Sequence, residues 1–328
     1  MLEHGGNLVT AARQYGIPLD DWLDLSTGIN PSGYPVPTIQ ASLWQRLPQG
    51  DDGLREAAAR YYGTPHVLPC AGTQAVLQVL PKLRAPCRVA IPTPTYAEHP
   101  KAWEAAGHSI TRFNPADADQ QVTETDVLLL CHPNNPTGQR YDRATLQGWL
   151  DVLSKKGGWL IVDEAFLDTD PAQSLAPLAG QPGLIVLRSL GKFFGMAGAR
   201  VGFMIAWQAL RDEAEELLGP WPISGPARYA ARCALEDAVW QSTTRTRLEQ
   251  DATRLASLLQ QHGLPVTGGT SLYQWVKTER AEALHVQLAR QGILTRLFRD
   301  PLSLRFGLPG AEPDWQRLDA ALAPLAQA

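Results

Sequence analysis

Short apolar runs, bounded by glycine, proline or polar residues, recur along the first two thirds of this chain. The clearest lie at 88–91, 126–131, 159–162 and 184–187. Runs of this length that contain β-branched residues are typical of buried strands. Helices are expected before, between and after these strands, at about 54–62, 71–80, 142–153 and 208–218. The alternation of strand and helix predicts an α/β fold with an open, mostly parallel sheet.

A segment rich in proline and glycine, GPWPISGP at 219–226, interrupts this alternation and predicts a hinge. Beyond it a helix is expected at 243–262. Apolar stretches near 272–276 and 302–306 alternate with further helices. We therefore expect residues 226–328 to form a smaller C-terminal α/β domain.

The remaining residues divide into a large domain at 41–225 and an N-terminal segment at 1–40. The N-terminal segment contains HGGN and STGINPSGYPVP, which are rich in turn-forming residues. Trp22, Leu23 and Leu25 give it apolar anchors. We expect an extended, irregular segment that packs on the rest of the protein instead of a mobile tail.

Composition and charge exclude several classes of protein. The 328 residues are 44% hydrophobic, and a net charge of −4 without any basic run argues against nucleic-acid binding. No segment approaches the ~20 apolar residues of a membrane span, and the start has no signal-peptide pattern. The cysteines lack CxxC spacing, so neither disulfides nor a metal site are expected at Cys70, Cys87, Cys131 and Cys233. These features predict a cytoplasmic protein with no nucleic-acid or membrane partner.

Residues that could take part in catalysis or ligand binding follow the predicted strands. In open parallel sheets, ligands bind beyond the carboxyl ends of the strands, where Tyr96, Asn135 and Asp163 are expected. Lys192 lies in a glycine-rich loop after another strand, eight residues before Arg200. Burial and a neighbouring cation would lower the pKa of such a lysine and free its amine to attack a carbonyl.

Each of these features alone has an ordinary alternative. Lys192 could lie in a surface loop, and the acidic pair Asp163–Glu164 could simply be exposed at a strand end. A helix that begins at 72–74 could hold a phosphate or only water. Arg296 and Arg305 lie in short apolar segments, where they could capture an anion or face solvent. The residues alone leave these alternatives open.

Five motifs, in this order and spacing, carry a family resemblance over almost the whole chain. They are GTQ at 72–74, PTY at 94–96, NNPTG at 134–138, DEAF at 163–166 and SLGKFFGMAGARVG at 189–202. Together they resemble pyridoxal-phosphate (PLP) enzymes of fold type I, in the class I and II aminotransferase branch. The resemblance implies a large domain with a mostly parallel seven-stranded sheet, a small C-terminal domain, bound PLP and a homodimer.

The resemblance also implies a role for each matching residue. Lys192 would form the Schiff base with PLP and then move protons at the substrate carbon. Asp163 would pair with the pyridine nitrogen, Asn135 would donate to the phenolic oxygen of the ring, and Tyr96 would stack on the ring. The coenzyme phosphate would be held by Gly72, Thr73, Gln74, Ser189 and Arg200.

The chain departs from the family pattern at two points. The family commonly has a tyrosine where Phe166 stands, so one donor to the phenolic oxygen is missing or comes from elsewhere. It also commonly has Tyr-Pro-Asp before the helix at 54–62, and that tyrosine reaches the phosphate of the neighbouring subunit. This chain has Leu-Pro-Gln at 47–49. The contact between subunits is therefore in doubt.

The N-terminal segment indicates which reaction this branch of the family performs. HGGN at 4–7, LDLSTGINPSG at 23–33 and Phe166 resemble decarboxylases of L-threonine O-3-phosphate in cobalamin biosynthesis. Transamination of histidinol phosphate is the alternative. The resemblance implies that Arg305 clamps the substrate carboxylate. The two ends of the expected substrate are anionic, so we expect the N-terminal segment to cover the active site and the substrate to be bound by Arg305, Arg296, His4 and Asn30.

Overall fold

The computed structural model describes residues 4–325, which form two compact units. The large unit contains residues 34–135 and 140–242. The small unit contains the described residues up to 33, residues 136–139, and the described residues from 243 onward. The division expected from the sequence, with boundaries near 40 and 225, stays a prediction.

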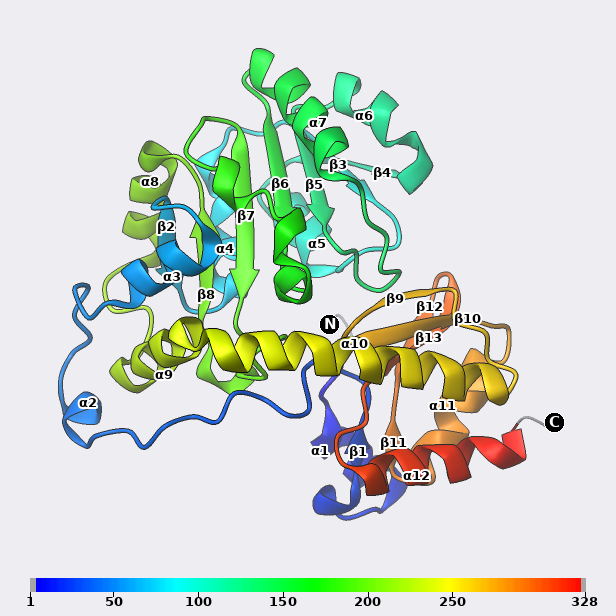
Figure 1. The fold of residues 1–328 in the computed structure, drawn as a ribbon. Coiled ribbons are helices and arrows are strands. Elements are labelled where there is room, and N and C mark those ends of the chain that lie inside the picture. The colour runs from blue at the N-terminus through cyan, green and yellow to red at the C-terminus, as the bar shows by residue number, and fades with distance from the viewer. Residues whose placement is uncertain (1–3, 326–328) are drawn as a thin grey trace. The chain divides into compact units, whose positions relative to one another are not determined.

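The large unit is built on a seven-stranded sheet, shown in the upper half of Figure 1. The strand order is β2-β8-β7-β6-β5-β3-β4, and only β8 runs antiparallel to its neighbours. This confirms the predicted fold class. The strands are β2 (Val67–Cys70), β3 (Arg88–Pro92), β4 (Ser109–Phe113), β5 (Val127–Cys131), β6 (Trp159–Asp163), β7 (Leu184–Ser189) and β8 (Gly202–Ile205).

Helices cover this sheet because its central strands are buried on both faces, as the apolar runs predicted. One face packs against α4, α5 and α8 in a single apolar core. Each leucine or isoleucine fully buried there stabilises the fold by about 2 kcal/mol. The helices of the large unit are α2 (Ser42–Gln45), α3 (Leu54–Tyr62), α4 (Thr73–Val79), α5 (Glu98–Ala105), α6 (Ala118–Glu124), α7 (Arg143–Lys155), α8 (Gln208–Leu218) and α9 (Gly225–Glu236).

The topology gathers the candidate residues at one edge of the sheet. Strands β3, β5, β6 and β7 are parallel neighbours, so their carboxyl ends lie together. Cys131, the last residue of β5, pairs in register with Asp163, the last residue of β6. Lys192 follows the end of β7 by three residues. The sheet therefore brings residues far apart in the sequence to one place.

The small unit contains a four-stranded sheet of order β12-β13-β10-β9 and a two-stranded parallel pair of β1 with β11. Helix α10 (Ala238–Gln261) runs from the large unit into it. Its other elements are α1 (Leu8–Tyr15), β1 (Leu23–Asp24), β9 (Gly268–Thr270), β10 (Tyr273–Lys277), α11 (Ala281–Ala289), β11 (Ile293–Leu294), β12 (Arg296–Arg299), β13 (Leu302–Gly307) and α12 (Glu312–Leu322).

Three local expectations were wrong. Residues 8–15 are helical, because Ala11 and its apolar neighbours pack against Trp22 and Ala289, and the glycines around them hid this pattern. Residues 225–236 form α9, which begins where the Ser224 hydroxyl caps it, so the irregular segment is shorter than expected. The next helix, α10, begins at Ala238 instead of at residue 243.

Within the described residues no helix is long and apolar enough to cross a membrane.

Candidate active site

Lys192 lies in the loop that connects the antiparallel neighbours β7 and β8. The Ser189 hydroxyl accepts a hydrogen bond from Gly191 N at 3.2 Å, which fixes the start of the loop. The Lys192 side chain is half-buried, and its Nζ lies 5.2 Å from the centroid of the Phe166 ring. Phe166 is itself buried. The amine therefore lies over an apolar aromatic face at the carboxyl end of the sheet.

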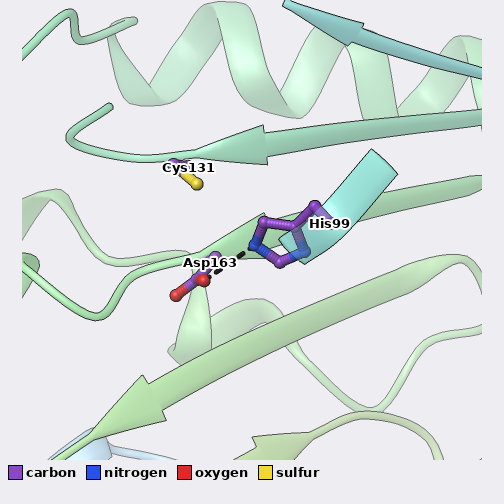
Figure 2. A group of neighbouring side chains, drawn as sticks. All are labelled: His99, Cys131 and Asp163. Atoms are coloured by element: carbon purple, nitrogen blue, oxygen red, sulfur yellow. Dashed lines mark hydrogen bonds and ion pairs between the residues drawn. The ribbon is translucent and has the colours of Figure 1, made fainter. Parts of the chain in front are cut away.

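Asp163 and His99 form a buried pair beside this loop (Figure 2). Asp163 Oδ2 lies 2.9 Å from His99 Nε2, and Asp163 Oδ1 accepts a hydrogen bond from Ala165 N at 3.1 Å. Burial lowers the pKa of His99, but the Cys131 and Asp163 side chains outweigh burial and raise this pKa to about 10. His99 is therefore a cation at neutral pH and pairs with the Asp163 carboxylate.

The neighbouring carboxylate, Glu164, faces a different part of the large unit. It lies 2.6 Å from the Arg188 guanidinium and accepts hydrogen bonds from Ser174 Oγ at 2.5 Å and Leu175 N at 2.8 Å. Arg188 also pairs with Asp168. Consecutive residues at a strand end point to opposite faces, so only one carboxylate can face the site. The strand pattern alone left this choice open and the resemblance named Asp163; in the structure Glu164 pairs with Arg188 instead.

Asn135 and Tyr96 lie on neighbouring loops that are joined by Asn134. The Asn134 side chain donates to Pro94 O at 2.9 Å and accepts from Thr95 Oγ1 at 3.0 Å. Tyr96 is half-buried, and its hydroxyl donates to Gln74 Oε1 at 3.4 Å. Burial, with Asp163 nearby, raises the pKa of Tyr96 to about 12. The Tyr96 ring is therefore a neutral, fixed surface at the end of β3.

The predicted phosphate residues meet where α4 begins. A Cβ atom at Gly72 would lie 2.6 Å from Nη2 of Arg200, and one at Gly202 would lie 2.7 Å from Thr73 N. Gly72 also has φ of 71°, a left-handed conformation that glycine adopts without strain. Ser189 pairs with Gly202 in the sheet. Backbone N–H groups, a hydroxyl and a guanidinium thus come together at the start of α4, packed so closely that only glycine fits at positions 72 and 202.

Arg305 and Arg296 lie opposite each other on β13 and β12 of the small unit. Arg305 is buried, donates from Nη2 to Ser26 O at 2.7 Å, and lies 5.0 Å from the Tyr273 ring centroid. Burial lowers the pKa of Arg305 to about 10, and Arg296 adds to this effect against the opposing effect of Tyr273. Two adjacent guanidinium groups in a buried setting favour binding of an anion.

Asn30 and His4, the two other predicted substrate residues, are placed differently. Asn30 is buried, and its Oδ1 accepts from Ser32 N at 3.0 Å and Arg247 Nη2 at 3.1 Å. His4 is exposed. The bonds of Asn30 give it a role in shaping the loop and bring Arg247 beside it.

Comparisons with known proteins place the chain in a family. The sequence profile of the family described as aminotransferase class I and II matches residues 45–323. The chain therefore belongs to this family.

Two curated relatives match the chain over nearly their whole length. Threonine-phosphate decarboxylase of Pseudomonas aeruginosa is 52% identical over 322 residues, which are 98% of this chain and 97% of that protein. The enzyme of the same name from a Sinorhizobium species is 44% identical, with the same coverage of both chains. The solved structure of histidinol-phosphate aminotransferase from Sinorhizobium meliloti in complex with pyridoxal-5'-phosphate has a TM-score of 0.80 at 19% identity, and covers 100% of this chain and 98% of that one. Within the family, the chain groups with the threonine-phosphate decarboxylases.

The residues of the large unit carry the chemical groups that are needed to bind PLP. The carboxyl end of the sheet offers one amine for an aldehyde, one buried anion for a protonated ring nitrogen, and one glycine-lined space for a phosphate. These belong to Lys192, Asp163 and the turn at Gly72, respectively. The fit depends on close packing at Gly72 and Gly202, where a larger residue would fill the space.

Three residues of these sites were not predicted from the sequence: His99, Cys131 and Arg247. His99 follows Tyr96 by three residues at the start of α5, which places both side chains on one face of the turn. That spacing could have identified it. Cys131 and Arg247 carried no comparable signal, because only the sheet register and the path of the N-terminal segment bring them to these positions.

Proposed function

We propose that the chain is a PLP-dependent carboxy-lyase that converts L-threonine O-3-phosphate to (R)-1-amino-2-propanol O-2-phosphate and CO₂. The near-full-length identity of 52% to a threonine-phosphate decarboxylase is the observation that carries this proposal. The amine of Lys192 and the Asp163–His99 pair give it a chemical basis.

In this proposal the large unit holds the coenzyme and moves protons. Lys192 would hold the coenzyme through its aldehyde and would return a proton to the substrate carbon. Asp163, paired with His99, would stabilise the positive charge on the ring nitrogen. Asn135 donates to the phenolic oxygen, and Tyr96 covers one face of the ring. The phosphate is bound by Gly72, Thr73, Gln74, Ser189 and Arg200.

Orientation of the substrate decides the reaction. When bound, PLP supplies an electron sink that weakens whichever Cα bond stands perpendicular to its ring. A decarboxylase must therefore hold the carboxylate out of the ring plane. We assign the carboxylate to Arg305, and the substrate phosphate to Arg296 with His4 and Asn30 of the N-terminal segment. Guanidinium groups suit both anions.

The purified protein should release CO₂ from L-threonine O-3-phosphate without any 2-oxo acid. This assay separates decarboxylation from the alternative, which is transamination of histidinol phosphate. The observation that favours the alternative is the fold shared with a histidinol-phosphate aminotransferase at a TM-score of 0.80. A strict requirement for 2-oxoglutarate would overturn the decarboxylase proposal.

We also propose that the protein is a cytoplasmic homodimer that serves cobalamin biosynthesis. Four large apolar side chains of the large unit are exposed and could contribute to an interface between two copies: Val36, Trp44, Leu47 and Trp221. The four cysteines are free, as in a reducing compartment. Sedimentation at twice the 35.8 kDa of one chain supports the dimer, and sedimentation at 35.8 kDa opposes it.

A further inference from the structure

Three side chains with metal-ligating atoms meet at the carboxyl end of the sheet in the large unit. Cys131 ends β5, Asp163 ends β6, and His99 projects from α5. One ligand atom from each residue lies within 4.8 Å of the other two. In Figure 2 the sulfur and the carboxylate lie on the same side of the imidazole ring. Thiolate, imidazole and carboxylate are the ligand types that zinc binds in proteins.

Rigid elements hold these three residues. Cys131 and Asp163 are register partners on adjacent parallel strands, which places their side chains next to each other on one face of the sheet. All three residues are buried, at 1% exposure for His99, 5% for Cys131 and 6% for Asp163. The proposed function uses the His99–Asp163 pair but assigns no role to the Cys131 thiol. Thr95 Oγ1 contacts the sulfur at 3.5 Å.

The three ligand atoms lie within 4.8 Å of one another, and the separation of the histidine and aspartate atoms is close to that which a metal ion needs. Typical Zn–N, Zn–O and Zn–S lengths place the ligand atoms of a tetrahedral site roughly 3.3–3.6 Å apart. His99 Nε2 and Asp163 Oδ2 are now 2.9 Å apart. A metal ion in place of the proton between them requires a separation of about 0.5 Å more, which small side-chain rotations provide. Three protein ligands leave the fourth position open.

We propose that the coenzyme-free protein binds one thiophilic divalent cation, with Zn²⁺ as the type, through Cys131 Sγ, His99 Nε2 and Asp163 Oδ2. The ion displaces the thiol proton and the Nε2 proton, and both pass to the solvent without any redox change. The metal and the coenzyme exclude each other, because both require the Asp163 carboxylate. This exclusion rests on the proposed function of Asp163.

Cobalt titration of the full-length protein after removal of PLP tests the site directly. Co²⁺ should bind with a stoichiometry of one per chain and give a thiolate-to-cobalt charge-transfer absorption that excess Zn²⁺ abolishes. Cys131→Ser should lose this absorption and bind Zn²⁺ at least about tenfold more weakly. Cys233→Ser, which alters a partly buried thiol on α9 of the same unit, should behave as wild type. Uptake of PLP by Cys131→Ser shows that this variant is folded.

The outcomes separate the metal site from the proposed function. Absence of the charge-transfer absorption, or equal Zn²⁺ affinity of wild type and Cys131→Ser, overturns the metal site, while PLP uptake tests the coenzyme site independently. Zn²⁺ should reduce the rate of PLP uptake by the wild type, and PLP-loaded protein should not give the cobalt signal. If the metal binds at Cys131 but leaves PLP uptake unchanged, the mutual exclusion is wrong.

Discussion

At the scale of single residues, two adjacent carboxylates at one strand end have different roles. Asp163 faces the candidate active site and pairs with His99, whereas Glu164 neutralises the buried Arg188. A charge that is buried without its partner costs several kcal/mol, so Glu164 contributes to stability. Asp163 contributes to the electrostatics of the site. Loss of the carboxylate is therefore expected to have a different effect at position 163 than at position 164.

Conversion of each carboxylate to its amide separates these tasks. Asp163→Asn should reduce kcat for CO₂ release by roughly 100-fold or more, because the anion proposed to face the ring nitrogen is lost, and it should also lower Tm, because His99 loses its buried partner. Glu164→Gln should lower the free energy of unfolding by about 3 kcal/mol, because Arg188 keeps only Asp168. Steady-state kinetics and thermal unfolding measure the two effects. A Glu164→Gln variant that loses as much kcat as Asp163→Asn would contradict the assignment.

The candidate coenzyme residues, Asp163 among them, could be named from the sequence, because the order and spacing of their motifs along the chain are local features; their roles stay predictions. The partners of Glu164 could not be named, since Arg188 and Ser174 are distant in the sequence and only the fold brings them to it. The pairing of Arg247 with Asn30 was also out of reach, because 216 residues separate the two along the chain.

At the scale of elements, β8 and α4 approach each other so closely that glycine is required between them. A Cβ atom at Gly202 would lie 2.7 Å from Thr73 N and 3.0 Å from Arg188 O, both backbone atoms that cannot rotate away. Gly198 lies in the loop before β8 and has no atom within 4 Å of its virtual Cβ. Gly198 can therefore serve as the control position for a substitution at Gly202.

Gly202→Ala should reduce stability by about 1–3 kcal/mol and weaken coenzyme binding, because β8 must move away from the proposed phosphate site. Gly198→Ala should leave both properties close to wild type. Thermal unfolding and titration with PLP measure the two quantities. A Gly202→Ala variant with unchanged coenzyme affinity would show that this contact does not shape the phosphate site.

Strands β3, β5, β6 and β7 and several helices of the large unit followed from its apolar runs, because burial on both faces leaves a clear pattern. β4 was not predicted: its exposed and half-buried residues give no apolar run, and its pairing with β3 is what defines it. Helix α1 was missed because tertiary packing against Trp22 and Ala289, and not local propensity, stabilises it.

At the scale of the whole molecule, one buried histidine links stability to pH. His132 is 1% exposed, and neither ring nitrogen has a hydrogen-bond partner within the described residues. Burial, with Arg140 nearby, lowers the pKa of His132 from 6.5 to about 4, against the opposing effect of Asp170. The unfolded chain therefore binds a proton at a higher pH than the folded chain does. The stability from His132 is complete above pH 6.5 and is lost as pH falls toward 4.

His132→Gln should remove this dependence. Between pH 6.5 and 4 the wild type should lose about 3 kcal/mol more unfolding free energy than the variant, since one titrating group is absent. Denaturant unfolding at a series of pH values measures the difference. Parallel stability curves for the two proteins over this range would show that His132 is not the group responsible.

The central claim is that the amine of residue 192 carries the coenzyme in a decarboxylase, and one experiment tests it most directly. The purified, PLP-loaded protein is reduced with borohydride, which fixes the coenzyme to its lysine, and the labelled peptide is located by mass spectrometry. The label should map to Lys192, and the reduced protein should no longer release CO₂ from L-threonine O-3-phosphate. A label on another lysine, or no label in a protein that still releases CO₂, would contradict the account.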